Sequence, residues 1–202
     1  DIISHKTYVK ALLLYIIRDL RDFRLLHGDD SLGGMIICES SSQAKMMNQI
    51  FQEVQDEINA EDTNKCNFKQ ALILHDSDDK ETRKQLVYDY KKKNTIDILI
   101  VYNMLLTGFD APRLKRLYFG RKVKDHNLLQ AITRVNRPYK DMKRGYVIDF
   151  ADIKANFEQT NEAYMRELNK YNIKLSTEND EEVNPNEDLP NMYEQVMENK
   201  EE

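Results

Sequence analysis

The sequence predicts an α/β fold, in which a mostly parallel sheet carries helices on both faces and helical additions extend both ends. Between residues 35 and 150, strand-like apolar segments alternate with amphipathic segments, usually at spacings that suit right-handed crossovers between parallel strands. The segment IDILIVY at 96–102 is almost continuously apolar and β-branched, as a strand buried on both faces requires. The 202 residues, 41% hydrophobic and 32% charged, suit one globular domain with an appendage.

The helices are predicted from apolar residues that recur every three or four positions. The first, at 5–26, has this periodicity and is closed by Gly28. The second begins behind Ser40–Ser42, which are favoured N-cap types, and carries one apolar stripe from Met47 to Ile58. Three further helices are expected, at 79–93, 125–136 and 153–171.

The strands are short apolar segments that alternate with these helices. They are expected at 35–38, 71–74, 96–102, 114–119 and 145–150. The chain then divides into a helical lead-in from a preceding lobe at 1–29, the α/β lobe at 30–152, and a helical extension with an acidic linker or tail at 153–202. Ligands of such sheets lie beyond the carboxyl ends of the strands. We therefore expect 39–42, 102–112 and the helix at 125–137 to matter most.

Composition excludes several classes of protein. No apolar run approaches the ~20 residues that cross a membrane, there is no secretory signal, and the chain opens on Asp1, which suggests a fragment of a longer polypeptide. Two cysteines give no disulfide framework: Cys38 is expected as a buried small hydrophobe and Cys66 as a loop thiol. We expect a reducing, cytoplasmic protein. The four histidines lack metal-ligand spacing, so no metal site is predicted.

Charge is unevenly distributed along the chain. Residues 176–202 contain ten acidic residues and one lysine, whereas residues 111–144 contain eleven Lys or Arg and two Asp. The basic block indicates a polyanionic partner for the body of the chain, the alternative being an ordinary solvated helix face.

The segment LLQAITRVNRP at 128–138 places polar and apolar residues on opposite helix faces. Gln130, Arg134 and Arg137 fall within about 60° of one another at 100° per residue. Two guanidinium groups on a rigid element suit a phosphate group. An amphipathic surface helix with exposed arginines is the alternative.

The loop NMLLTGFDAP follows the buried strand at 96–102. Gly108 allows a sharp turn, Thr107 is a potential donor to a phosphate, and Asp110 is a potential partner for a ribose hydroxyl or an arginine. The alternative is a turn in which Gly108 and Asp110 only form the turn.

Together these segments resemble the second RecA-like lobe of superfamily 2 helicases and translocases. In that family G-x-D belongs to motif V and Q-x-x-x-R-x-x-R to motif VI, and GMIICESSSQAKMM is similar to motif IV. A longer segment is very similar to the motor and endonuclease (R) subunit of type I restriction–modification enzymes. Its sequence is LLTGFDAPRLKRLYFGRKVKDHNLLQAITRVNRPYKDMKRGYVIDF. The resemblance covers about 30–153. Many superfamily relatives have glycine where Thr133 and Asn136 stand, and threonine where Tyr102 stands.

The resemblance implies a role for each matching residue. Arg134 and Arg137 would be arginine fingers to the ATP γ-phosphate, and Gln130 would help to position phosphate or the neighbouring lobe. Gly108 and Asp110 would couple the nucleotide to the DNA track. The residues expected to contact the DNA backbone are Ser40, Ser41 and Thr107. ATP and Mg would be bound mainly by a preceding P-loop lobe, and the remaining partners would be double-stranded DNA, a nuclease domain of the same polypeptide, and methyltransferase and specificity subunits.

Two motifs of such a motor are missing from this sequence. It contains no G-x-x-x-x-G-K-[ST] and no recognisable D…E-x-K nuclease set. We therefore expect this segment alone neither to hydrolyse ATP nor to cut DNA. Two other functions stay open: the equivalent lobe of another superfamily 2 helicase or translocase, and a non-catalytic RecA-like binding module.

Overall fold

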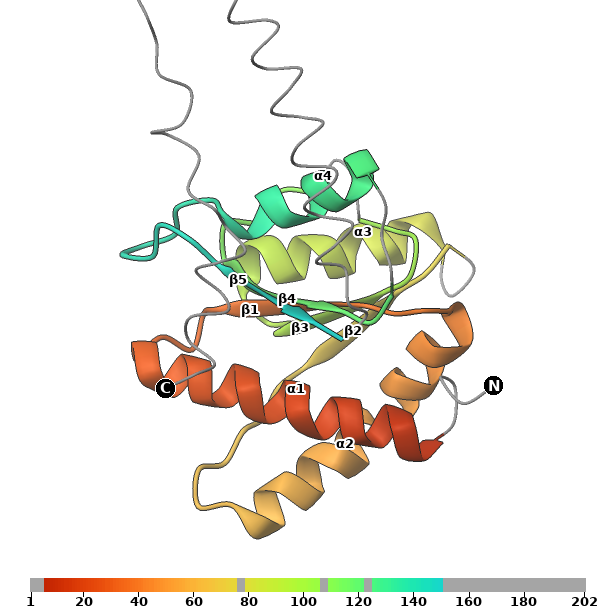
Figure 1. The fold of residues 1–202 in the computed structure, drawn as a ribbon, viewed down its shortest axis with the longest axis vertical. Helices are drawn as coiled ribbons and strands as arrows, with labels where there is room; N and C mark the ends of the chain where they lie inside the picture. The colour runs from red at the N-terminus through yellow and green to blue at the C-terminus, as the bar shows by residue number, and fades with distance from the viewer. Residues whose placement is uncertain (1–5, 76–78, 106–108, 122–124, 151–202) are drawn as a thin grey trace, which may run out of the picture. The chain divides into compact units, whose positions relative to one another are not determined.

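The computed structural model describes residues 6–75, 79–105, 109–121 and 125–150, and only the backbone of residues 125–129. Its sheet has the strand order β2-β3-β1-β4-β5, and every neighbouring pair is parallel (Figure 1). The strands are β1 (Gly33–Ile37), β2 (Gln70–Ile73), β3 (Ile98–Val101), β4 (Leu114–Phe119) and β5 (Tyr146–Asp149). The α/β prediction is confirmed, and the five strands described are all parallel.

Helices cover both faces of this sheet. Two lie on one face, α1 (Lys6–His27) and α2 (Ser41–Glu61), and two on the other, α3 (Lys80–Tyr88) and α4 (Asp125–Val135) (Figure 1). The single helix predicted at 79–93 is not uniform, because α3 widens into the π-helical turn η2 (Asp89–Lys93) and the chain then leaves through Asn94 at φ 55°. The helix predicted at 153–171 lies outside the described residues.

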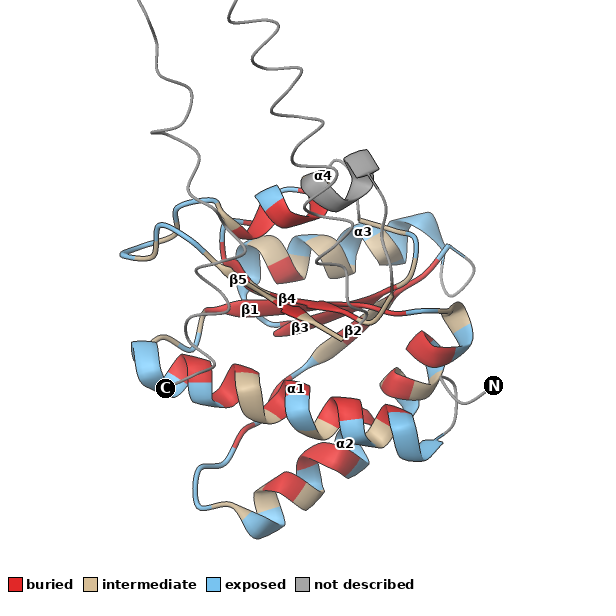
Figure 2. Cartoon of the chain, viewed as in Figure 1, coloured by how far each residue is buried: buried red, intermediate tan, exposed pale blue. Residues whose placement is uncertain are grey.

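The central strand β1 is buried along its whole length (Figure 2). Alternate side chains of the sheet point to opposite faces. Ile36 and Ile100 join the core beneath α1 and α2, while Met35 and Leu99 point the other way. A Cβ atom on Gly33 would lie 2.3 Å from the hydroxyl oxygen of Tyr90, a ring fully buried in η2. The strand therefore needs a glycine there to admit the ring.

Both cysteines are buried free thiols. Burial raises the pKa of Cys38 to about 12 and also raises the pKa of Cys66. Cys66 lies in the loop between α2 and β2, as predicted. It is only 7% exposed, because the Asn59 side chain binds its backbone N–H and carbonyl and holds the loop against α2.

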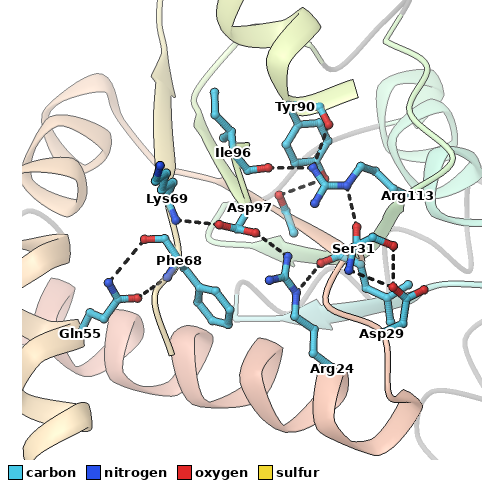
Figure 3. A network of polar contacts seen from close by, with 12 residues as sticks. Arg24, Asp29, Ser31, Gln55, Phe68, Lys69, Tyr90, Ile96, Asp97 and Arg113 are labelled. Carbon is cyan, nitrogen blue, oxygen red and sulfur yellow. Dashed lines mark hydrogen bonds and ion pairs between the residues drawn. The ribbon is translucent and has the colours of Figure 1, made fainter. Parts of the chain in front are cut away.

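A buried polar network closes the amino ends of the central strands (Figure 3). Arg24, near the end of α1, donates to Asp97 just before β3 at 2.7 Å, and the other Asp97 oxygen accepts the Lys69 N–H at 2.8 Å. Arg113, just before β4, is 2% exposed. Its guanidinium donates to the carbonyls of Ser31, Tyr90 and Ile96. These bonds fix where three strands start.

The same network reaches the turn that follows α4. Both Asp29 carboxylate oxygens accept from Lys140 Nζ at 2.8 Å, and Ser31 donates to the same carboxylate. Burial opposes ionisation of Asp29, but the bonds from Lys140 and Ser31 outweigh it and lower its pKa to about 2. The turn after α4 is therefore tied to the loop that enters β1.

Candidate functional site

The loop after β3 and the segment after α4 meet in an ion pair. Helix α4 ends at Val135, so Arg137 stands in the turn beyond it. Its guanidinium lies 2.9 Å from an Asp110 carboxylate oxygen, and both side chains are 51% exposed. A half-exposed pair of this kind is weakly held, so its arginine can exchange the carboxylate for another anion. Two predicted site residues are thus in direct contact.

Arg134 lies one turn earlier and in a different environment. The sequence predicts that it shares an exposed face with Arg137, but the residue is 8% exposed. Its guanidinium donates to the backbone carbonyl of Phe109, next to Asp110. Burial lowers the pKa of Arg134, the charge of Arg137 lowers it further, and Asp110 opposes both. The prediction of an exposed face is wrong for Arg134, because the loop at 109–111 packs over it.

A buried lysine supports the carbonyl end of α4. Lys115 is the second residue of β4 and is completely buried. Its ammonium group donates to the carbonyls of Val135 and Arg137. Burial lowers the pKa of Lys115 to about 8. A cation at a helix C-terminus interacts favourably with the helix dipole, so Lys115 helps to fix the backbone that carries Arg137.

These contacts put the arginines near the amino ends of the strands, whereas the sequence places the whole site at the carboxyl ends. Arg137 contacts Lys115 at the start of β4, and a Cβ atom on Gly145, just before β5, would lie 2.6 Å from the Val135 carbonyl. The prediction fails for the arginines because the carbonyl end of α4 is held by Lys115 at the start of β4 and lies against Gly145 just before β5. The predicted residues therefore form two groups.

The second group lies at the carboxyl edge. Ser40 is the N-cap of α2, and its hydroxyl oxygen accepts the N–H of Gln43 at 3.1 Å. Ser41 is the first residue of that helix. Gln43 is fully buried and its side-chain oxygen accepts the Glu39 N–H, which fixes the turn. A capping hydroxyl keeps its own proton to donate, so Ser40 can still bind an anion.

The remaining predicted residues contribute less. Gln130 is partly buried in α4, and its backbone carbonyl accepts the Thr133 hydroxyl. Thr107 and Gly108 lie outside the described residues. Within the described part of the chain, no three His, Cys, Asp or Glu side chains are grouped to bind a metal.

Two basic residues of the site escaped the sequence analysis. Lys115 is hidden inside an apolar strand, and its alternation with Leu114 gives no sign that it is buried. Arg121 follows β4 at the carboxyl edge, where its guanidinium lies 4.8 Å from the centre of the Tyr102 ring. The basic run GRK at 120–122 was a signal for it, although no spacing rule singled out the arginine.

Comparison with protein families decides the identity of the lobe. The model of domain 3 of the type I restriction enzyme subunit R matches residues 39–152, more than half of the chain. The chain belongs to this family. The matched residues 39–152 include both groups of predicted site residues.

Individual relatives agree with this membership. The endonuclease subunit of the type I restriction enzyme HindI from Haemophilus influenzae is 28% identical over 155 residues, which are 70% of this chain and 14% of that protein. A type I restriction enzyme endonuclease subunit from Staphylococcus saprophyticus is 40% identical over 89 residues, 39% of this chain and 10% of the relative. This R-subunit segment thus spans a small part of the length of these relatives.

Solved structures show the same fold. Domain 2 of a DEAD-box helicase, bound to an RNA duplex, matches with a TM-score of 0.52 and 16% identity, covering 79% of this chain and 56% of that one. A fragment described as an HsdR subunit of a type I restriction enzyme from Vibrio vulnificus matches with a TM-score of 0.52 and 18% identity, covering 77% and 30%. The segment has the RecA-like fold of these helicase domains. Among its described helices, none is long and apolar enough to cross a membrane.

Proposed function

We propose that this segment is the second motor lobe of a type I restriction R subunit, which couples ATP hydrolysis to movement along double-stranded DNA before cleavage. The supporting observation is the contact between the loop after β3 and the end of α4, where Asp110 pairs with Arg137 and Arg134 holds the Phe109 carbonyl. The full motor also needs a preceding P-loop lobe, a nuclease domain, and methyltransferase and specificity subunits.

The arginine group suits a nucleotide phosphate. Bound ATP with Mg would supply the phosphoryl group that is transferred, and most of its contacts would come from the P-loop lobe. On this chain, Arg137 presents a half-exposed guanidinium beside a carboxylate it can leave. Arg134 contributes a second positive charge and anchors the loop at 109–111 through the Phe109 carbonyl, while Gln130 and Gly108 position the two segments. Arginines that meet charge developing in the transition state stabilise it strongly.

The serine group suits the DNA backbone. Ser40 caps α2 and Ser41 is its first residue, at the opposite edge of the sheet. Thr107, which lies outside the described residues, would be a third such hydroxyl. Hydroxyl contacts to phosphates carry no sequence information, which a motor that moves along any duplex requires. The separation of the two groups lets one edge bind nucleotide and the other bind DNA.

The test is DNA-stimulated ATP hydrolysis by the full-length R subunit in its assembled complex. Arg137→Ala should lower the turnover on the order of 10³-fold while leaving ATP binding, measured by a fluorescent analogue, within a few-fold. Arg18→Ala is the matched control, because Arg18 forms a surface pair with Glu61 on the other face of the sheet. Unchanged turnover in the Arg137 variant would remove the finger assignment, and an unmodified complex without DNA-stimulated turnover would favour a binding module.

The isolated 202-residue segment provides a second test. Because its sequence has no P-loop motif, we infer that it does not hydrolyse ATP on its own. Turnover approaching that of the assembled complex would contradict this.

A further inference from the structure

Arg121 stands out among the arginines of the described residues by what it contacts. Arg24 and Arg116 pair with carboxylates, and Arg113 is surrounded by carbonyls. Arg121 has no carboxylate partner in the described part of the chain, and its guanidinium lies over the Tyr102 ring. Its Nε is buried without a hydrogen-bond partner among the described residues, as is one guanidinium nitrogen of Arg113 and one of Arg116.

The strand order shows where this side chain runs. Arg121 follows β4 and Tyr102 follows β3, and β1 lies between these two strands. Neighbouring strands are about 4.8 Å apart, so the contact between the two side chains spans the end of β1. The chain turns from that strand end through Ser40 into α2. The contact therefore lies at the edge of the sheet that carries the predicted DNA contacts Ser40 and Ser41.

The backbone fixes the origin of the side chain. The Gly120 N–H donates to the Ile37 carbonyl at 2.8 Å, which extends the pairing of β4 with β1 by one residue. A Cβ atom on Gly120 would lie 2.9 Å from the same carbonyl oxygen. Only a glycine lets the two strand ends approach so closely. Arg121 is the next residue, so its backbone is fixed at the carboxyl edge of the sheet.

The Tyr102 ring holds the guanidinium without using its hydrogen-bond donors. A guanidinium that stacks on a ring keeps its N–H groups in its own plane, free to bind a phosphate in a fork. Arg121 is only partly buried, and its guanidinium has no carboxylate partner among the described residues. An arginine in this arrangement is suited to bind an anion.

We propose that Arg121, stacked on Tyr102, binds a backbone phosphate of the DNA duplex at the carboxyl edge, beside Ser40 and Ser41. The proposal rests on the proposed function and adds to it a positively charged contact that the motifs do not include. The ATP phosphates are the other source of such an anion. They are assigned to Arg137 near the amino ends of the strands, so a single phosphate does not serve both arginines.

The experiment measures binding of a fluorescent duplex without a recognition site to the full-length R subunit in its complex, over a series of KCl concentrations. Arg121→Gln should weaken binding about tenfold at low salt and reduce the slope of log K against log salt by about 1. Tyr102→Phe keeps the ring and should bind the duplex as the unmodified protein does, whereas Tyr102→Leu should lower the affinity for the duplex several-fold. Arg18→Gln, a surface arginine on α1, is the control for loss of charge alone.

The outcomes separate this proposal from its alternatives. Unchanged affinity and salt slope for Arg121→Gln would overturn it, as would a loss of affinity for an ATP analogue measured without DNA, which would place the phosphate in the nucleotide. Arg121→Lys keeps the charge without the forked donors, so its DNA affinity should lie between those of the unmodified protein and Arg121→Gln. This intermediate affinity guards against a glutamine variant that is merely misfolded. If Arg137→Ala abolishes turnover while Arg121→Gln binds DNA normally, the proposed function stands and only the Arg121 assignment fails.

Discussion

The amino and carboxyl edges of the sheet use arginine in opposite ways. At the amino edge, Arg24 and Arg113 are buried and bound to protein oxygens, so their charge serves to join strands. At the carboxyl edge, Arg121 is held by a ring and has no protein acceptor in the described residues. The partners of an arginine, more than its position in a basic stretch of sequence, therefore separate scaffold from binding site.

Breaking the amino edge should give the largest effect. Asp97→Ala removes the carboxylate that Arg24 and the Lys69 N–H share and leaves a buried cation without its partner. We expect the free energy of unfolding to fall by about 3–5 kcal/mol, measured by urea denaturation. Glu61→Gln is the matched control, because it breaks only the surface pair with Arg18 and should cost less than about 1 kcal/mol. Similar losses in both variants would refute the scaffold role.

The buried Lys115 at the amino edge should make stability depend on pH. Its folded pKa of about 8 lies below the ordinary value near 10.5, so between these values the unfolded chain binds more protons and stability rises with pH. Relative to Lys115→Met, the unmodified protein should gain about 2 kcal/mol from pH 7 to pH 9.5. Urea denaturation of both proteins at each pH measures this difference and cancels the titration of other groups. A difference that does not change with pH would show that the buried ammonium is not destabilised.

The carboxyl edge should respond least in stability. Ser40→Ala removes the N-cap bond to Gln43 and should cost about 1 kcal/mol, by thermal or urea denaturation. Ser42→Ala, at an exposed position in the same first turn, provides the control and should be close to neutral. If Ser40→Ala lowers the free energy of unfolding as much as Asp97→Ala is expected to, the carboxyl edge also serves as scaffold.

The sequence predicted the fold well because the strands are apolar on both sides and the helices on one. The segment at 96–102 contains the strand β3, since a strand covered by helices on both faces cannot carry many polar groups. The change from α-helix to π-helix within 79–93 was not predicted. The residues of η2 pack against a distant part of the chain, where Tyr90 lies against Gly33, and helical periodicity contains no information about that contact.

The candidate site was predicted in part, for a similar reason. Helical periodicity placed Arg134 and Arg137 on one exposed face, but Arg134 is buried, because periodicity describes one helix and contains nothing about the loop that covers it. The pair of Arg24 with Asp97 joins residues 73 positions apart, which no local pattern links. The sequence predicted either a ribose hydroxyl or an arginine as the partner of Asp110, and the structure pairs it with Arg137. The roles assigned to the site residues stay predictions.

The close fit between Gly33 and Tyr90 also bears on how this lobe can evolve. The hydroxyl of the ring occupies the space that any side chain at position 33 would fill, so neither position can change size alone without loss of packing. A larger residue at 33 requires a smaller one at 90, and the intermediate carries either a clash or a cavity. Drift at these two sites therefore has to proceed by paired exchange, and lineages of the family are expected to keep or replace both together.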